Sequence, residues 1–190
     1  MLSGHQIRLL ELLDEQLLSC KDCDLWIGGT SKPYWTPKSR YAIIGEAPGE
    51  KEVRSEPFIG PAGRKLWEVV NLMGLRKEDF VIINTVNCRP VNNDGSNGKP
   101  TNDQCETCFP YMRKYLKIVK PEKILLLGNF AVGVFTGEYS GIMKKNSNVE
   151  WNEEFGVNIV LSVHPSMCIY AGVRGKAMLH ESIKVFKELK

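Results

Sequence analysis

Six cysteines are the first residues in this sequence whose spacing suggests chemistry. Two pairs are separated by two residues, Cys20 with Cys23 and Cys105 with Cys108. This spacing lets two thiolates turn toward one metal centre, and both zinc sites and iron–sulfur clusters accept four thiolates. The spacing alone therefore predicts a metal site and leaves zinc and an iron–sulfur cluster as alternatives.

A second group of side chains with chemical potential lies where apolar segments end. These are Glu46, Asn84 and His164, and each comes at or directly after the end of a predicted strand. Phe58 is a lone aromatic residue in a Pro-Phe-Ile-Gly turn. A carboxylate, a two-sided amide, an imidazole and a flat ring are suited to hold a planar heterocycle. The sequence therefore predicts a pocket for such a ligand.

The elements that must position these groups alternate between strands and helices. The apolar segments that predict strands lie at 41–45, 80–86, 123–128 and 157–163. The longer segments with helical spacing lie at 5–18, 64–75, 101–119 and 175–189. The polar segment 137–155 is expected to be a connection only. This alternation predicts an α/β fold, a three-layer α/β/α sandwich with a four-stranded, mostly parallel central sheet. Such sheets bind ligands at the carboxyl ends of their strands.

The whole sequence has the composition of an ordinary globular protein. Its 190 residues, 43% hydrophobic and 25% charged, predict a single domain over 1–190. The net charge of +3 permits a nucleic-acid partner without requiring one. No segment approaches the roughly eighteen apolar residues of a membrane span, and carboxylates interrupt the apolar pattern near the N-terminus. We therefore expect a cytoplasmic protein that makes no use of a membrane.

Four segments occur in the order found in the thermophile-type, iron–sulfur uracil-DNA glycosylases known as family 4, which the sequence resembles. They are GEAPGE…PFIGPAG at 45–63, NTVNCRP at 84–90, PTNDQCETCFPYM at 100–112 and HPS at 164–166. The resemblance implies a DNA repair enzyme that flips uracil out of DNA and hydrolyses its N-glycosidic bond, leaving an abasic site. It also implies a monomer whose partner is uracil-containing DNA, single- or double-stranded.

The resemblance implies particular roles for the residues of the predicted pocket. Glu46 and His164 would be catalytic, with His164 donating a hydrogen bond to uracil O2. Residues implied to bind the uracil are Ala47, Glu52, Phe58 and Asn84. Phe58 would stack on the base, Asn84 would read its Watson–Crick edge, and Glu52 would crowd the C5 position so that thymine is excluded.

The resemblance also implies a [4Fe–4S] cluster with a structural role. Its ligands would be Cys20, Cys23, Cys88 and Cys108. Cys108 lies in Cys-Phe-Pro-Tyr, which matches the C-x-P-Y of the family and leaves Cys105 as a spare, although spacing alone favours both. Arg89, next to a ligand, is hypothesised to contact DNA phosphates.

Departures from the family pattern keep other functions open. The stretch between Gly49 and Pro57 is one residue shorter, and the connection 91–100 is longer. Residues 167–170 read Met-Cys-Ile-Tyr in place of an aromatic residue, two aliphatic residues and an arginine, and Arg174 comes further on. One alternative is a catalytically silent relative that keeps the cluster and binds nucleic acid. Another is a zinc protein with an unrelated small-molecule site.

Overall fold

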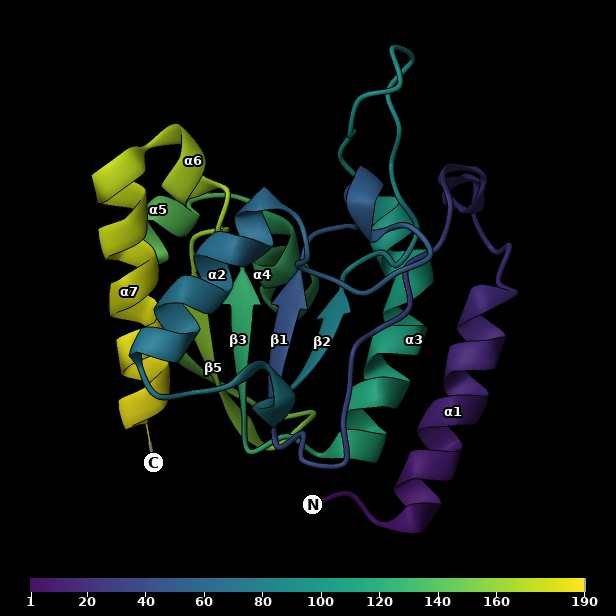
Figure 1. The fold of residues 1–190 in the computed structure, drawn as a ribbon, viewed down its shortest axis with the longest axis horizontal. Helices are drawn as coiled ribbons and strands as arrows, with labels where there is room; N and C mark the ends of the chain where they lie inside the picture. The colour runs from purple at the N-terminus through teal and green to yellow at the C-terminus, as the bar shows by residue number, and fades with distance from the viewer. Residues whose placement is uncertain (190) are drawn as a thin grey trace.

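A computed structural model describes residues 1–189 and contains one five-stranded sheet (Figure 1). The strands are β1 (Tyr41–Gly45), β2 (Phe80–Asn84), β3 (Lys123–Leu127), β4 (Val149–Asn152) and β5 (Val157–Ser162). Their order in the sheet is β2-β1-β3-β5-β4, and every pair is parallel except β4 with β5. The mostly parallel sheet predicted from the sequence is confirmed.

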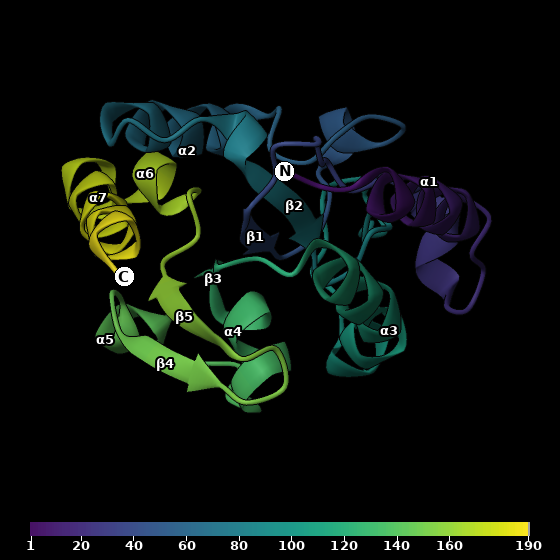
Figure 2. The same ribbon diagram turned by 90° about the horizontal axis from the view of Figure 1, so that it is seen from below.

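Helices cover both faces of the sheet (Figure 2). The α-helices are α1 (Gly4–Leu18), α2 (Pro61–Leu72), α3 (Asn102–Val119), α4 (Asn129–Thr136), α5 (Ile142–Lys145), α6 (Met167–Tyr170) and α7 (Gly172–Glu188). The 3₁₀ turns are η1 (Asp24–Gly28), η2 (Glu50–Glu52) and η3 (Lys77–Asp79). Helices α1, α3 and α4 contribute to the core on one face, and α2, α6 and α7 to the core on the other. This arrangement is the predicted three-layer sandwich.

The strand count differs from the prediction of four. The additional strand, β4, lies inside the polar segment 137–155 and pairs antiparallel with β5. It carries no buried residue, so its sequence lacks the continuous apolar run that marks the other strands. An edge strand of this kind is held by its backbone hydrogen bonds to β5, which hydrophobic patterning does not reveal.

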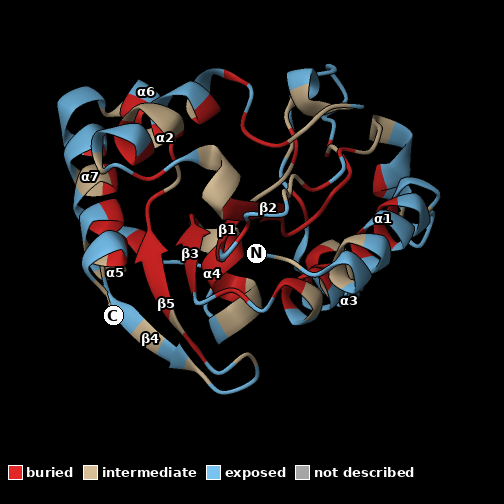
Figure 3. Ribbon diagram, turned by 60° about the horizontal axis from the view of Figure 1, so that its bottom comes forward, coloured by how far each residue is buried: buried red, intermediate tan, exposed pale blue. Residues whose placement is uncertain are grey.

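Alternation along the strands divides the core into two faces. In β1, Ala42 and Ile44 face the first helical layer, whereas Tyr41 and Ile43 face the second. Strands β1, β2 and β3 are buried along their whole length, and the exposed residues lie on the outer sides of the helices (Figure 3). A strand that is buried on both faces has to read as a continuous apolar run, which is why these strands are visible in the sequence.

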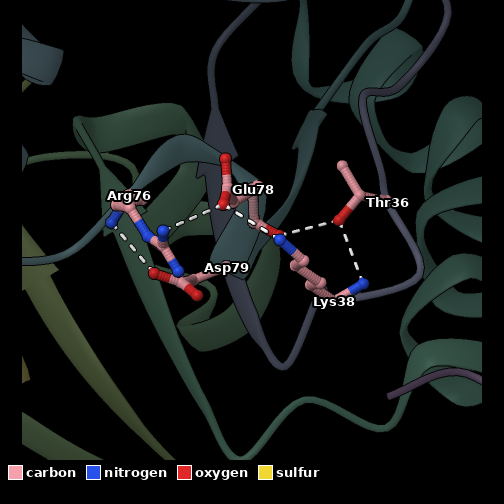
Figure 4. Close-up of polar contacts among 5 residues, drawn as sticks. All are labelled: Thr36, Lys38, Arg76, Glu78 and Asp79. Atoms are coloured by element: carbon pink, nitrogen blue, oxygen red, sulfur yellow. Dashed lines mark hydrogen bonds and ion pairs between the residues drawn. The ribbon is translucent and has the colours of Figure 1, made fainter.

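A polar network ties the loop before β1 to the turn before β2 (Figure 4). Thr36 Oγ1 donates a hydrogen bond to the Glu78 carbonyl (2.8 Å), and Lys38 Nζ lies 3.3 Å from the Glu78 carboxylate. Because this network lies at the amino ends of β1 and β2, it supports the register in which Gly45 pairs with Asn84 at their carboxyl ends. Among residues 1–189, no helix is both long and apolar enough to cross a bilayer.

Candidate functional site

The carboxyl ends of β1 and β2 bring two of the predicted residues together. Gly45 pairs with Asn84, and Glu46 and Thr85 follow them. Thr85 donates twice to the neighbouring segment, from its backbone N–H to the Gly45 carbonyl (2.9 Å) and from Oγ1 to the Glu46 carbonyl (2.5 Å). The backbone that carries Glu46 is therefore held by β2, and Thr85 is a supporting residue that sequence patterning did not single out.

Asn84 carries a buried donor that has no partner. Its side chain is 2% exposed, and Nδ2 is the one buried side-chain nitrogen or oxygen atom within residues 1–189 that lacks a hydrogen bond. A Cβ added to Gly45 would overlap Asn84 Oδ1 and would lie 2.7 Å from the ring of Phe58. The amide and the aromatic ring therefore meet beside Gly45, where a larger residue would fill the space between them.

Phe58 is held in a backbone conformation that non-glycine residues rarely adopt. Its φ is +59°, in the left-handed region. Its carbonyl accepts a hydrogen bond from Trp67 Nε1 (2.9 Å), and a Cβ added to Gly63 would overlap the same carbonyl. Strain of this kind costs on the order of 1–3 kcal/mol and persists only where the surroundings enforce it. Helix α2, which carries Trp67 and Gly63, therefore fixes the backbone of Phe58.

Two carboxylates of the site have raised pKa values because burial disfavours their charged forms. Burial raises the pKa of Glu46, and the nearby positive charge of Lys99 partly opposes this shift. Burial also raises the pKa of Glu52, opposed by backbone N–H groups of Gly49 and of the 58–60 turn. Glu52 Oε2 accepts from the Gly49 N–H at 3.2 Å, so its carboxylate ties η2 to the turn that holds Phe58.

His164 follows β5 and faces Phe58, with the two ring centroids 6.1 Å apart and the planes inclined by 36°. The backbone N–H of Ser166 points at His164 Nδ1 (3.3 Å), and Ser166 Oγ lies 2.9 Å from the same nitrogen. Because Nδ1 accepts, the proton of the neutral ring is on Nε2. Burial lowers the pKa of His164 to about 4, so the imidazole is neutral at physiological pH.

Two hollows that share several lining residues open at these strand ends, and together we call them the strand-end cleft. One has a volume of about 360 Å³ and is lined by Ala47, Glu52, Phe58 and His164, among others. The other, of about 480 Å³, is lined by Glu46, Ala47 and His164. Both are also lined by Asn97 and Ser166, which were not among the predicted site residues. Asn84 lines neither hollow, because it lies deeper, beside Gly45.

A larger cavity of about 810 Å³ lies elsewhere on the molecule. It is lined by residues from the end of α1, from η1 and from 54–56, including Trp26 and Arg54. It contains none of the strand-end groups described above. Size alone therefore does not identify the site. The strand-end cleft is the better candidate because it combines an aromatic face, an imidazole and two carboxylates with raised pKa values, and because the unpartnered Asn84 amide lies close to Phe58, which lines it.

Four cysteines line one small apolar cavity, which we call the cysteine cavity. They are Cys20, Cys23, Cys88 and Cys108. Leu17, Leu25 and Val86 form part of its wall. Thr30 Oγ1 lies 3.3 Å from Cys88 Sγ, and Asn87 Nδ2 donates to Cys108 Sγ at 3.7 Å. Four thiols in apolar surroundings, two of them with a hydrogen-bonding side chain beside the sulfur atom, fit the chemistry of an iron–sulfur cluster.

Cys105 is fully buried outside this cavity, with its Sγ directed to Thr85 Oγ1 at 3.7 Å. Within residues 1–189, no three His, Cys, Asp or Glu side chains converge closely enough to hold a single metal ion. The lining of the cysteine cavity includes Cys20, Cys23, Cys88 and Cys108 but not Cys105, which packs in the same buried cluster as Cys88.

Comparison with known proteins gives consistent results. A sequence model of the uracil DNA glycosylase superfamily matches residues 33–187. The type-4 uracil-DNA glycosylase of Archaeoglobus fulgidus is 33% identical over 176 residues, covering 85% of this chain and 85% of the relative. That of Sulfurisphaera tokodaii is 32% identical over 95% of this chain and 84% of the relative. That of Thermotoga maritima is 32% identical over 83% of this chain and 82% of the relative.

Proposed function

We propose that this chain, which belongs to the uracil DNA glycosylase superfamily and to its type-4 family, removes uracil from DNA by hydrolysing the N-glycosidic bond. The substrate would be a nucleotide extruded from the strand, because a stacked base cannot reach a donor as deeply buried as Asn84. The products would be free uracil and DNA with an abasic site.

The unpartnered amide of Asn84 is the observation that carries this proposal. Uracil offers an N3–H donor and an O4 acceptor side by side, and one carboxamide can satisfy both through Oδ1 and Nδ2. The free Nδ2 of Asn84 would then gain the partner that it lacks in the protein alone. Cytosine has an acceptor at N3 and a donor at N4, so the Asn84 amide would face groups that it cannot pair with. Each unpaired buried group costs about 1–3 kcal/mol. The amide would therefore select uracil over cytosine.

The leaving group would be stabilised by Phe58 and His164. The Phe58 ring supplies a fixed face for stacking. When the bond between N1 and C1′ breaks, its electron pair leaves with uracil and negative charge builds on O2. A neutral His164 that carries its proton on Nε2 is suited to donate to O2. Comparable oxyanion donors contribute about 2.7–4 kcal/mol to the transition state.

Glu46 is assigned to the sugar side of the reaction. Positive charge develops at C1′ as uracil departs, and a carboxylate would stabilise it. Water then adds at C1′, and Glu46 would take its proton. Burial raises the pKa of Glu46, which makes the carboxylate a stronger base than an exposed one. The position of Glu46 on the 480 Å³ hollow, which His164 also lines, supports this assignment.

Ala47 and Glu52 would shape the pocket around the base. Ala47 lines both hollows of the strand-end cleft, and its backbone would contact the uracil. The Glu52 carboxylate is anchored to backbone N–H groups of Gly49 and the 58–60 turn. Anchoring of this kind would keep Glu52 in place beside C5 of the base, where a methyl group would collide with it.

The four cysteines of the cysteine cavity would hold a [4Fe–4S] cluster. When bound, it would supply a structural cross-link rather than a reacting group. Cys20 and Cys23 follow α1, Cys88 follows β2, and Cys108 lies in α3, so these segments would be tied together. Such thiols stay reduced in the cytoplasm, where we propose that the chain acts as a single-domain monomer.

The proposed function is tested by measuring uracil release from single-stranded and U·G duplex oligonucleotides. Wild-type protein is compared with Asn84→Ala. We expect release by the wild type and a fall in kcat/KM of roughly 10²–10³-fold in the variant, as for loss of comparable transition-state donors. The melting temperature should not fall, because the variant removes an unsatisfied buried group. Wild-type protein that binds DNA but releases no uracil at large enzyme excess would instead favour the catalytically silent relative.

A further inference from the structure

Residues 89–98 form a hairpin on the side of the sheet toward which β1, β2 and β3 point (Figure 1). Val91 bridges to Asn97, the Asn92 N–H donates to the Ser96 carbonyl (3.0 Å), and the Gly98 N–H donates to the Pro90 carbonyl (2.8 Å). The connection that is longer than in the family is thus an ordered element with its own hydrogen bonds.

The guanidinium of Arg89 is directed into this hairpin. Its Nε donates to Asn97 Oδ1 (2.7 Å), and its Nη2 donates to the Gly95 carbonyl (2.8 Å). The sequence led us to expect that Arg89 contacts DNA phosphates directly. In the structure, two of its donors hold the hairpin instead, so an effect of Arg89 on DNA would act through the residues that it orients.

The contact with Arg89 fixes the orientation of the Asn97 amide. Arginine has no acceptor, so the atom of Asn97 that faces it must be the oxygen. The amide nitrogen then points away from Arg89, and Nδ2 lies 3.4 Å from the position of a Cβ added to Gly49. No hydrogen bond among residues 1–189 uses this nitrogen as a donor. Asn97 therefore presents a free N–H group beside Gly49.

This free donor lies at the cleft where the extruded nucleotide would enter. Asn97 is exposed and lines both hollows of the strand-end cleft, each together with His164. Lys51 lines one hollow and Lys99 the other, so positive charge is present on both. Glu46, Glu50 and Glu52 line the same hollows and carry the opposing charge.

We propose that Asn97 donates a hydrogen bond from Nδ2 to the backbone phosphate of the extruded nucleotide, and that Arg89 is its positioning residue. This inference rests on the proposed function, because only base extrusion brings a phosphate to the rim of the cleft. A phosphate oxygen can only accept, which matches the donor that Asn97 offers. The hairpin is then a DNA-positioning element that the shorter family connection would lack.

Two substitutions at one position separate a DNA contact from a purely structural role. Asn97→Asp keeps an acceptor for Arg89 Nε, so the hairpin stays closed, but it replaces the free donor with negative charge. Asn97→Ala removes both the acceptor for Arg89 and the free donor. A structural role predicts that the aspartate variant behaves as wild type. A phosphate contact predicts that it binds DNA more weakly than the alanine variant does, because like charges then face each other.

The probe is a fluorescent single-stranded oligonucleotide that carries one tetrahydrofuran abasic-site analogue, titrated by anisotropy at fixed salt. We expect Kd to rise about tenfold for Asn97→Ala, as for loss of one hydrogen bond to a charged acceptor, and further for Asn97→Asp. Arg89→Ala should raise Kd by a similar factor, but should have little further effect in the Asn97→Ala background. With a uracil substrate, KM should rise while kcat stays within about twofold.

Asn93→Asp is the matched control, because Asn93 is exposed in the same hairpin and lines neither hollow. If Asn93→Asp and Asn97→Asp weaken DNA binding equally, the effect is general charge repulsion and the proposal is wrong. If Asn97→Asp binds DNA as tightly as wild type, the role of Asn97 is structural and the proposal is wrong as well. If wild-type protein releases uracil but both Asn97 variants bind the oligonucleotide as tightly as wild type, this inference is wrong and the proposed function stands. If wild-type protein releases no uracil, the proposed function itself is wrong.

Discussion

The strand-end cleft and the cysteine cavity are assembled in different ways. Glu46, Asn84 and His164 lie at or just beyond the carboxyl ends of β1, β2 and β5, whose register is set by the hydrogen bonds of the sheet. The cysteines come from the segment after α1, the loop after β2 and the first half of α3. The sheet register therefore positions these groups, whereas the cysteine cavity brings together segments that no shared sheet register holds.

The largest expected effect separates the two regions through Cys108 and Cys105. Cys108→Ser should abolish most bound iron and acid-labile sulfide and lower the free energy of unfolding by at least about 2 kcal/mol, because a cross-link between segments is lost. Cys105→Ser is the matched control three residues away in the same helix, and it should keep full iron and sulfide. Chemical assay of both elements, together with urea unfolding, measures these outcomes.

Equal loss of iron from both variants would contradict the grouping seen in the cysteine cavity. Stoichiometric zinc in the purified wild-type protein, without iron or sulfide, would favour the alternative metal that spacing left open. In either case Glu46, Asn84 and His164 would keep their places, because backbone hydrogen bonds of the sheet fix the strands that carry them.

The same contrast explains what the sequence could predict. Strands that are buried on both faces appear as apolar runs, and parallel strands bring their carboxyl ends together. The sequence could therefore predict that Glu46, Asn84 and His164 lie at one edge of the sheet. Neighbours that arise from loops were not predictable in this way. Nothing in the local pattern indicates that Asn97 reaches the cleft, since this depends on a hairpin closed by Arg89.

Cysteine spacing could not distinguish Cys105 from Cys108 for a related reason. Cys105 and Cys108 have the same spacing as Cys20 and Cys23, but α3 directs Cys105 toward Thr85 and Cys108 toward the cavity. The side of a helix on which a thiol lies is decided by packing against the sheet, and a two-residue gap carries no such information. Only the match to the Cys-x-Pro-Tyr pattern distinguished the two.

A smaller effect is expected from pH, and it belongs to the strand-end cleft. Burial lowers the pKa of His164 from its ordinary 6.5 to about 4. Between these values the unfolded chain binds the proton more readily, so stability falls as pH decreases through this window and is unaffected by His164 above it. The two pKa values give a loss of about 2 kcal/mol between pH 7 and pH 5.

The difference between wild type and His164→Gln in urea unfolding at several pH values isolates this contribution, because the other titrating groups are common to both proteins. The variant should lose about 2 kcal/mol less than wild type between pH 7 and pH 5. Parallel curves for the two proteins would mean that His164 titrates normally, and its assignment as a neutral donor would then fail.

The smallest effect is expected at Ser166, which tests how the donor face of His164 is fixed. Ser166→Ala removes the hydroxyl near Nδ1 and keeps the backbone N–H that points at the same nitrogen. Because one of two contacts survives, we expect kcat/KM to fall only about two- to fivefold, equivalent to 0.4–1 kcal/mol, with no change in melting temperature. Ser166→Thr keeps a hydroxyl and should retain most of the activity. Ser166 also lines both hollows of the strand-end cleft, so a fall beyond about fiftyfold, without rescue by threonine, would mean that its hydroxyl touches the substrate directly.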